Sequence, residues 1–479
     1  MNTLLSASLL PADTAATFEV TNPADGTLLG RVPDSGREET HAAIAAAKKA
    51  FPGWAARTAK QRAQVLRDWY NLILSNHEEL ARLLTLEQGK PLTEARSEIL
   101  YGAAFVEWFA EEGKRLYGDV VPTTSPDKRL LVLKQPIGVV GAITPWNFPN
   151  AMVTRKIAPA LAAGCTIVLK PAEDTPLSAL ALAELARRAG VPDGVINIVT
   201  SSRPREVADV LTSSPDVRKL SFTGSTQVGK ILMRQCSDTL KRLSLELGGN
   251  APLIVFEDAE LDAAVAGAVV SKFRNGGQTC VSANRILVHE SVMHAFAAKF
   301  SAAAAALRVG DGLQEGTTIG PLINEEAVAK VERLVRDAVA SGARAVTGGA
   351  RHSNGGNFFS PTVLTGVAPD MTIAREEIFG PVAPLYPFKT EEQAVRIAND
   401  TPYGLAAYFY TCDLSRAFRV AEALEYGMVG LNEVTISNEA APFGGMKESG
   451  VGREGSKYGL DDYVEIKYFC IGGIASAAR

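Results

Sequence analysis

The alternation of short apolar runs with helix-like segments between residues 139 and 249 constrains the fold of this chain most. The runs read VVGAIT, CTIVLK, GVINIVT, KLSFTG and RLSLELGG, and each is followed by a helix-like segment or a glycine-rich turn. Strands separated by helical segments of about ten or more residues are typical of βαβ crossovers and a parallel sheet. Because ligands bind at the carboxyl ends of parallel strands, functional residues are expected just after each run.

The length of 479 residues is too great for a single hydrophobic core and predicts two or three domains. Residues 38–90 have a helical period almost throughout, and a second α/β series runs from residue 251 to about 445. Two outlying segments, 127–138 and 461–473, are predicted to be strands. Exposed edge strands invite pairing, so these two segments are either tucked into a domain or used in subunit assembly, and we favour assembly.

The composition is that of an ordinary globular protein, with 46% hydrophobic residues and a net charge of −4. Neither sign of charge forms a long run, so we expect a small-molecule substrate and no nucleic-acid or membrane partner. The start of the chain, MNTLLSASLLPADTAATF, lacks the basic and apolar regions of a signal peptide, and we expect a cytoplasmic location. The five cysteines are scattered without a CxxC pair, which indicates free thiols and no metal site.

Polar side chains follow the first two strands of the predicted sheet. Asn147 in ITPWNFP offers two uncharged hydrogen-bond donors, although a turn asparagine would look the same. Lys170 and Glu173 in IVLKPAE could hold the hydroxyls of a bound sugar, or form a surface ion pair of little consequence.

The later strands end in glycine-rich turns. Gly224, Ser225 and Gly229 lead into a helix whose free N–H groups favour phosphate, but FTGSTQVG is not GxGxxG and predicts a dinucleotide only weakly. Glu246 lies between two leucines and before a glycine pair, so it is either a salt-bridged strand glutamate or a general base whose pKa is raised by desolvation.

Cys280, in GGQTCVSANR, is either a catalytic nucleophile or one more buried thiol. None of the five histidines lies beside a glycine-rich stretch, so a cysteine–histidine dyad is not favoured. If Cys280 is catalytic, a carboxylate is the expected water-activating partner.

Eight motifs, in this order along nearly the whole chain, carry a resemblance to a known family: ITPWNFP, KPAEDTP, FTGSTQVG, LELGGNAP, GGQTCVSANR, EEIFGPV, ANDTPYGLAAY and PFGGMKESGVGREGSKYG. The chain resembles the aldehyde dehydrogenase superfamily. Within it, the stretches SKFRNGGQTC and REGSKYGLDDYVEIKYFCIGG are most similar to the succinate-semialdehyde dehydrogenases.

The resemblance implies an α/β fold of three parts. Residues 1–120 and 140–247 would form a Rossmann-type cofactor domain, and residues 248–445 an α/β catalytic domain. Residues 121–139 and 446–479 would form a small oligomerisation sheet in a homodimer or homotetramer.

The resemblance also assigns roles to residues. Cys280 would attack the aldehyde carbon, Asn147 and the Cys280 N–H would hold the oxyanion, and Glu246 would activate the water that hydrolyses the thioester. The cofactor would be held by eight residues: Trp146, Lys170, Glu173, Gly224, Ser225, Gly229, Glu377 and Phe379. NAD is the expected cofactor because Glu173 would repel a 2′-phosphate, while Arg203 and Arg205 leave NADP open.

Substrate choice would depend on Arg155, Arg274 and Ser437, which match the residues that receive the distal carboxylate in succinate-semialdehyde dehydrogenases. A planar guanidinium suits a carboxylate because it can bind it bidentately, whereas a surface ion pair is the ordinary role of an arginine. Val434 and Thr435 replace residues that are often glycine, so glutarate semialdehyde or a broad range of aldehydes is the alternative. Ser282 stands where some relatives have a second cysteine, and no redox switch is expected.

Other classes are less favoured. The presence of both Cys280 and Glu246 speaks against a catalytically silent member, and Glu246 against a CoA-acylating relative. A cofactor-independent thiol hydrolase remains the remote alternative.

Overall fold

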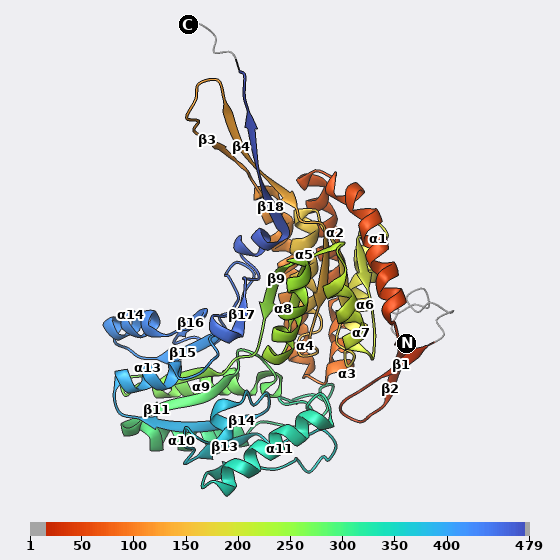
Figure 1. The fold of residues 1–479 in the computed structure, drawn as a ribbon. Coiled ribbons are helices and arrows are strands. Elements are labelled where there is room, and N and C mark those ends of the chain that lie inside the picture. The colour runs from red at the N-terminus through yellow and green to blue at the C-terminus, as the bar shows by residue number, and fades with distance from the viewer. Residues whose placement is uncertain (1–15, 475–479) are drawn as a thin grey trace.

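The computed structural model describes residues 16–474 and contains two α/β bodies with a ribbon of strands that projects from them (Figure 1). Most of the N-terminal stretch assessed for a signal peptide, residues 1–15, lies outside the described residues. A short antiparallel hairpin, β1 (Thr17–Thr21) and β2 (Leu28–Pro33), opens the described chain. Sequence reasoning did not identify this hairpin.

The first body is built on a six-stranded sheet of order β17-β9-β8-β5-β6-β7. Its strands are β5 (Val139–Ile143), β6 (Thr166–Lys170), β7 (Ile196–Ile198), β8 (Val217–Thr223), β9 (Arg242–Glu246) and β17 (Gly450–Val451). The pairings from β9 to β7 are all parallel, which confirms the sheet predicted from the alternating pattern. The crossover helices are α5 (Ala151–Ala163), α6 (Leu177–Arg188), α7 (Pro204–Ser213) and α8 (Thr226–Cys236).

The N-terminal helices cover this sheet as the helical period predicts. They are α1 (Arg37–Ala55), α2 (Ala59–Ser75), α3 (His77–Gln88) and α4 (Leu92–Glu112). Thr58 begins α2 with a capping box, because its side chain accepts from the Gln61 N–H while the Gln61 side chain accepts from the Thr58 N–H. Trp54 and Trp69 are buried, and their indole N–H groups donate to the carbonyls of Leu161 in α5 and Leu182 in α6. These contacts fix the outer helices against the crossover helices.

The second body is built on a seven-stranded sheet of order β12-β13-β14-β11-β10-β15-β16. The strands are β10 (Ala251–Val255), β11 (Ala283–His289), β12 (Arg344–Thr347), β13 (Thr362–Thr365), β14 (Val382–Phe388), β15 (Ala406–Tyr410) and β16 (Met428–Leu431). Only β12 pairs antiparallel, at one edge. The helices are α9 (Leu261–Phe273), α10 (Glu290–Ala305), α11 (Glu325–Ala340), α12 (Thr372–Arg375), α13 (Glu391–Asn399) and α14 (Leu414–Ala423).

The two outlying segments, which were predicted to be strands, form strands that pair with each other. β18 (Val464–Ile471) and β3 (Asp119–Val121) flank β4 (Arg129–Pro136) in an antiparallel sheet that extends away from both bodies (Figure 1). Ile466 and Tyr468 on β18 are 71% and 63% exposed, although they are large apolar side chains.

The strand memberships differ from the predicted segment boundaries at two places. β3 begins at Asp119, before the expected start of the oligomerisation segment at residue 121. β17 falls within the segment 446–479 but pairs with β9 of the first body, because the chain returns there to cover the free edge of the six-stranded sheet. The division into three functional domains remains a prediction.

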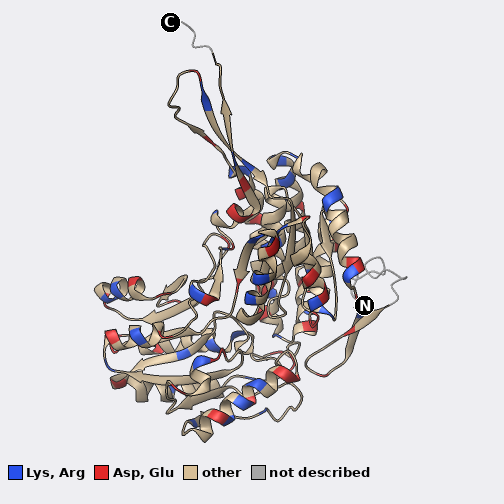
Figure 2. Cartoon of the chain, viewed as in Figure 1, with Lys and Arg blue, Asp and Glu red and all other residues tan. Residues whose placement is uncertain are grey.

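Acidic and basic residues are interspersed over both bodies without a large area of one sign (Figure 2). Within residues 16–474, no helix combines the length and the apolar character needed to cross a membrane.

The pairing of β17 with β9 predicts a stability defect in Gly450→Ala. Gly450 has φ +148° and lies opposite Glu246, and a Cβ there would approach the Leu245 carbonyl oxygen to 2.1 Å. Strain of this kind costs about 1–3 kcal/mol, so the free energy of unfolding measured with urea should fall by that amount. Gly30→Ala is the matched control, since Gly30 has no atom within 4 Å of its Cβ position, and it should leave stability unchanged. Equal stabilities of the two variants would contradict the prediction.

Candidate active site

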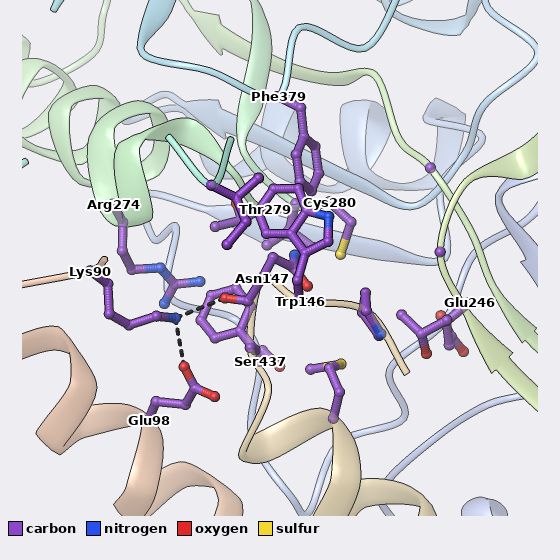
Figure 3. Close-up of a pocket in the computed structure, with 18 of the residues that line it drawn as sticks. Lys90, Glu98, Trp146, Asn147, Glu246, Arg274, Thr279, Cys280, Phe379 and Ser437 are labelled. Atoms are coloured by element: carbon purple, nitrogen blue, oxygen red, sulfur yellow. Dashed lines mark hydrogen bonds and ion pairs between the residues drawn. The ribbon is translucent and has the colours of Figure 1, made fainter. Parts of the chain in front are cut away.

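A cavity of about 1020 Å³ is lined by residues from both α/β bodies. All of the predicted site residues line it except Lys170, Glu173 and Gly229. In Figure 3, Cys280 and Asn147 lie near its centre, Arg274 on one side and Glu246 on the other. Sequence reasoning thus found most of one continuous site whose members lie far apart in the chain.

The loop that carries Cys280 has a left-handed backbone. It follows α9, and Asn275, Gly276 and Gly277 have φ values of 52°, 62° and 76°. A Cβ at Gly277 would lie 2.2 Å from the Gly380 carbonyl oxygen, so the turn requires glycine there. The turn directs the chain back toward β11 and leaves the partly exposed Cys280 at the cavity wall.

The surroundings of Cys280 favour the protonated form of its thiol. Burial raises the pKa of Cys280 to about 12, and the Glu377 carboxylate adds to the shift, whereas Arg155 opposes it. The thiolate is the nucleophilic form, so this site becomes reactive as a proton is removed.

Asn147 lies in the loop between β5 and α5 and is almost fully buried. Its Nδ2 donates to the Gln278 carbonyl oxygen at 3.1 Å, two residues before Cys280. Its Oδ1 has no hydrogen-bond partner among the described residues. The amide therefore faces the cysteine loop, as an oxyanion donor must.

Glu246 ends β9 and is buried, with no hydrogen-bond partner for either carboxylate oxygen in residues 16–474. Burial raises its pKa well above the usual value, and Glu454 adds to the shift, while Arg155 and Lys156 oppose it. No cation lies within 4 Å of the Glu246 carboxylate in the described chain, which excludes the alternative of a salt-bridged strand glutamate. A desolvated carboxylate with unused acceptors can take a proton from water.

Arg155 is buried, not a surface residue, and it pairs with a carboxylate that Lys156 shares. Its Nη2 lies 2.8 Å from Glu454 Oε2, and its Nη1 donates to the Tyr101 hydroxyl at 3.3 Å. The Tyr101 hydroxyl in turn contacts Ser437 Oγ in a short hydrogen bond. Arg155 therefore reaches the cavity together with Tyr101 and Ser437.

Arg274 differs from Arg155 because it makes no ion pair with any residue in the described part of the chain. It caps the end of α9, lines the cavity, and its guanidinium lies 5.6 Å from the centre of the Phe148 ring. It is the unpaired cation on its side of the cavity, where an anionic group would be attracted.

The other end of the cavity reaches the start of α8. Ser225 caps this helix by accepting from the Val228 N–H at 3.3 Å, and Gly224 precedes it at the cavity wall. Gly229 lies inside the helix and packs on Leu247, where a Cβ would come within 2.5 Å of Leu247 Cδ2. Its contribution is to let α8 approach β9, not to line the site.

Two aromatic rings and a carboxylate line the same cavity as the start of α8 and the thiol. The Trp146 and Phe379 rings meet edge to face at 5.5 Å, and Phe379 holds a left-handed φ of 55°. Burial raises the pKa of Glu377 to about 7, while the hydrogen bond that it accepts from the Gly249 N–H, at 3.0 Å, opposes the shift.

Lys170 ends β6 and Glu173 follows it, and the two form an ion pair of 2.7 Å with each other outside the cavity lining. The start of α8 offers free N–H groups, which suit the phosphates of a dinucleotide. The Glu377 carboxylate and the Lys170–Glu173 pair suit its ribose hydroxyls. The residues present therefore fit such a cofactor.

The cavity residues that sequence reasoning missed include Lys90, Glu94, Glu98 and Tyr101. They belong to α4 or the turn before it, where polar residues at helical spacing are ordinarily solvent-facing. No group of three or more candidate metal ligands occurs in residues 16–474.

Comparison with known proteins identifies the class. Residues 10–469 match the aldehyde dehydrogenase family. The chain is 62% identical over 469 residues to the NADP(+) succinate-semialdehyde dehydrogenase GabD of Escherichia coli, covering 98% of this chain and 97% of that protein. It is 60% identical to a glutarate-semialdehyde dehydrogenase of Pseudomonas aeruginosa, covering 97% and 96%. The crystal structure of succinate-semialdehyde dehydrogenase from Burkholderia pseudomallei superposes with a TM-score of 0.94 at 61% identity, covering 95% of each chain.

The chain belongs to the aldehyde dehydrogenase family. Its overall resemblance is to members that oxidise semialdehydes, and the predicted aldehyde dehydrogenase fold is confirmed. The roles of individual residues remain predictions.

The raised pKa of Cys280 predicts a steep pH dependence of its alkylation. Below a raised pKa the thiolate fraction grows about tenfold for each pH unit, so reaction with iodoacetamide should accelerate between pH 6 and pH 9. Peptide mass spectrometry separates Cys280 from the exposed Cys412 and Cys470, and Cys280→Ser provides the blank. A rate that is equal at pH 6 and pH 9 would show that the thiol is already ionised.

Proposed function

We propose that this protein oxidises a carboxylated semialdehyde, with succinate semialdehyde converted to succinate, and uses a nicotinamide dinucleotide as hydride acceptor. The observation that carries the proposal is the position of an unpaired guanidinium, Arg274, in the same cavity as Cys280, Asn147 and Glu246. A broad aldehyde oxidiser has no need of a half-buried guanidinium that lines this cavity without an ion-pair partner in the described chain.

The reaction begins at Cys280. After the Cys280 thiol has lost its proton to solvent, the thiolate attacks the aldehyde carbon, and Asn147 Nδ2 and the Cys280 N–H are the donors assigned to the resulting oxyanion. These donors are already held by the two loops, so they need little reorganisation as charge develops. A bound nicotinamide dinucleotide would supply the hydride acceptor for this carbon, and loss of the hydride would leave the acyl group on Cys280 as a thioester.

Glu246 serves the second half of the reaction. Its carboxylate has free acceptors and a raised pKa, so it can remove a proton from the water that attacks the thioester. This hydrolysis releases the acid and restores the Cys280 thiol. A water-activating carboxylate also argues against a CoA-acylating enzyme.

The distal carboxylate of the substrate is assigned to Arg274 together with the Tyr101–Ser437 pair. Arg274 supplies the net charge, while Arg155 orients the Tyr101 hydroxyl and itself pairs with Glu454. Glutarate semialdehyde remains the second candidate, since a glutarate-semialdehyde dehydrogenase is a relative at 60% identity and Thr435 lines the cavity.

NAD is the proposed cofactor, although the relative from Escherichia coli is named for NADP(+). The Glu173 carboxylate beside Lys170 would repel a 2′-phosphate. Arg203, which could have attracted that phosphate, pairs with Glu206 at 3.1 Å and donates to the Asp34 carbonyl oxygen, while Arg205 is exposed. These contacts favour NAD.

The assembly state is proposed to be a homodimer or homotetramer. The exposed apolar side chains of β18, including Ile466, Tyr468 and Phe469, offer a surface for a second copy of the chain. A cytoplasmic location and the absence of a redox switch at Ser282 stay predictions from the sequence.

The choice of substrate is tested with succinate semialdehyde, glutarate semialdehyde and butyraldehyde, each with NAD and with NADP. We expect kcat/KM to be highest for succinate semialdehyde with NAD. In Arg274→Met, kcat/KM for the carboxylated substrates should fall about 10- to 100-fold, because a hydrogen bond to a charged group is lost, while butyraldehyde is unaffected. Equal kcat/KM values for butyraldehyde and the semialdehydes in the parent protein would refute the carboxylate specificity.

The role of Glu246 is tested with Glu246→Gln. This variant should form one equivalent of NADH per active site in a rapid burst and then turn over at least about 10²-fold more slowly, since only thioester hydrolysis needs the base. Stopped-flow fluorescence of NADH measures both phases. Cys280→Ala should give no burst, and unchanged steady-state turnover in Glu246→Gln would assign the base to another residue.

A further inference from the structure

A buried ion pair lies next to Asn147 without a role in the proposed reaction. Lys90 Nζ is 2.5 Å from Glu98 Oε2, and both side chains are about 1% exposed (Figure 3). Removing two charges from water is expensive, and replacing a buried ion pair by apolar residues often leaves stability unchanged or improves it. Stability alone therefore does not account for this pair.

Two of the three N–H groups of the Lys90 ammonium donate to oxygens of the protein, and the ammonium also lies over an aromatic ring. Its ammonium group donates to Glu98 and to the Asn147 carbonyl oxygen at 2.8 Å, and it lies 4.0 Å from the centre of the Phe148 ring. A lysine bound in this way does not touch the reacting atoms but fixes the backbone of Asn147.

Glu98 holds the other side of the same loop. Its second oxygen, Oε1, accepts hydrogen bonds from the Asn150 N–H at 3.0 Å and the Ala151 N–H at 3.2 Å, at the start of α5. An acidic group is favoured there because the helix start carries free N–H groups and a positive partial charge. Lys90 and Glu98 thus hold the Asn147 loop from both ends.

Glu94 connects α4 to the cysteine loop. It is four residues before Glu98 in the same helix, and its Oε2 accepts from the Asn275 N–H at 2.8 Å. The Asn275 side chain links the cysteine loop to the Asn147 loop, because its Nδ2 donates to the Asn147 carbonyl oxygen at 2.9 Å. Residues four apart share a helix face, so a single face of α4 contacts both loops that form the oxyanion site.

We propose that Lys90, Glu94 and Glu98 form a positioning clamp that holds the Asn147 amide and the Cys280 loop in register for oxyanion binding. The clamp residues touch neither substrate nor cofactor and act through Asn147. This inference rests on the role of Asn147 in the proposed function.

The experiment compares Lys90→Met, Asn147→Ala and the double variant in single-turnover formation of NADH from succinate semialdehyde. A misplacement of about 1 Å in a reacting group can slow a reaction about 10²-fold, and a loss of that order is expected for Lys90→Met. The KM for NAD should not change. Because Lys90 acts through Asn147, the double variant should be no slower than Asn147→Ala alone.

Two further variants separate positioning from folding. Glu98→Gln removes the charge partner of Lys90 but keeps an oxygen for the Asn150 and Ala151 N–H groups, so it should fold and show a smaller loss that is also absent in the Asn147→Ala background. Lys241→Met is the matched control: Lys241 is a buried lysine that donates to the Ser214 and Val217 carbonyl oxygens and does not line the cavity. It should lower the thermal unfolding temperature and leave the single-turnover rate unchanged.

The outcomes are distinct. If the rate losses of Lys90→Met and Asn147→Ala multiply in the double variant, the clamp is overturned and the proposed function is left intact. Parental rates in both Lys90→Met and Glu98→Gln would have the same consequence. If Lys90→Met does not fold, the same comparison with Glu98→Gln decides. An Asn147→Ala protein with the parental rate would overturn the clamp together with the oxyanion role of Asn147, whereas NADH formation from the semialdehyde would still support the oxidation itself.

Discussion

Parallel strand pairing in two separate sheets is the constraint on which the site depends. A parallel sheet brings the ends of its strands to one edge, and there the chain must turn before each crossover helix. The loops after β5, β8 and β9 in the first body therefore lie close together, and the cysteine loop before β11 of the second body meets them. Because each loop is short and anchored at both ends, polar groups from residues 130 or more apart in the chain reach one cavity in fixed positions.

Some charged side chains of the cavity have an ion-pair partner and others do not, and this difference accounts for their separate roles. Arg155 pairs with Glu454, which Lys156 shares, and Lys90 pairs with Glu98, and these groups shape their surroundings through their contacts. Arg274 and Glu246 have no such partner within the described chain, and they lie on opposite sides of Cys280 (Figure 3). Glu246 is buried and Arg274 is half-buried, and a charged group without a partner is retained at a cost, so these two residues mark the places where an outside molecule completes the contacts.

Sequence reasoning located the strands of the first body and the residues that follow them, because hydrophobic period and strand ends are local properties. It could not find the partner of Arg155, since Glu454 lies in a returning segment some 300 residues later. Lys90, Glu94 and Glu98 were missed for a related reason: charges spaced along a helix look solvent-facing until the loops that cover them are known. The motif around Gly229 predicted a place in the cofactor site, whereas the residue contacts Leu247. The sequence could not show this, because a glycine that makes room for a ligand and one that makes room for a side chain are identical in sequence.

In the proposed oligomer, the projecting sheet of β3, β4 and β18 would tie the stability of one copy of the chain to the number of copies around it. Its outer face carries exposed apolar side chains, and β18 also reaches back to the first body through Arg242, which donates to the Val464 carbonyl oxygen at 2.6 Å. Any partner that covers this sheet binds only the folded chain, so mass action would shift the folding equilibrium with total protein concentration. Dilution would then shift this protein toward the unfolded state, as a denaturant does to a monomer.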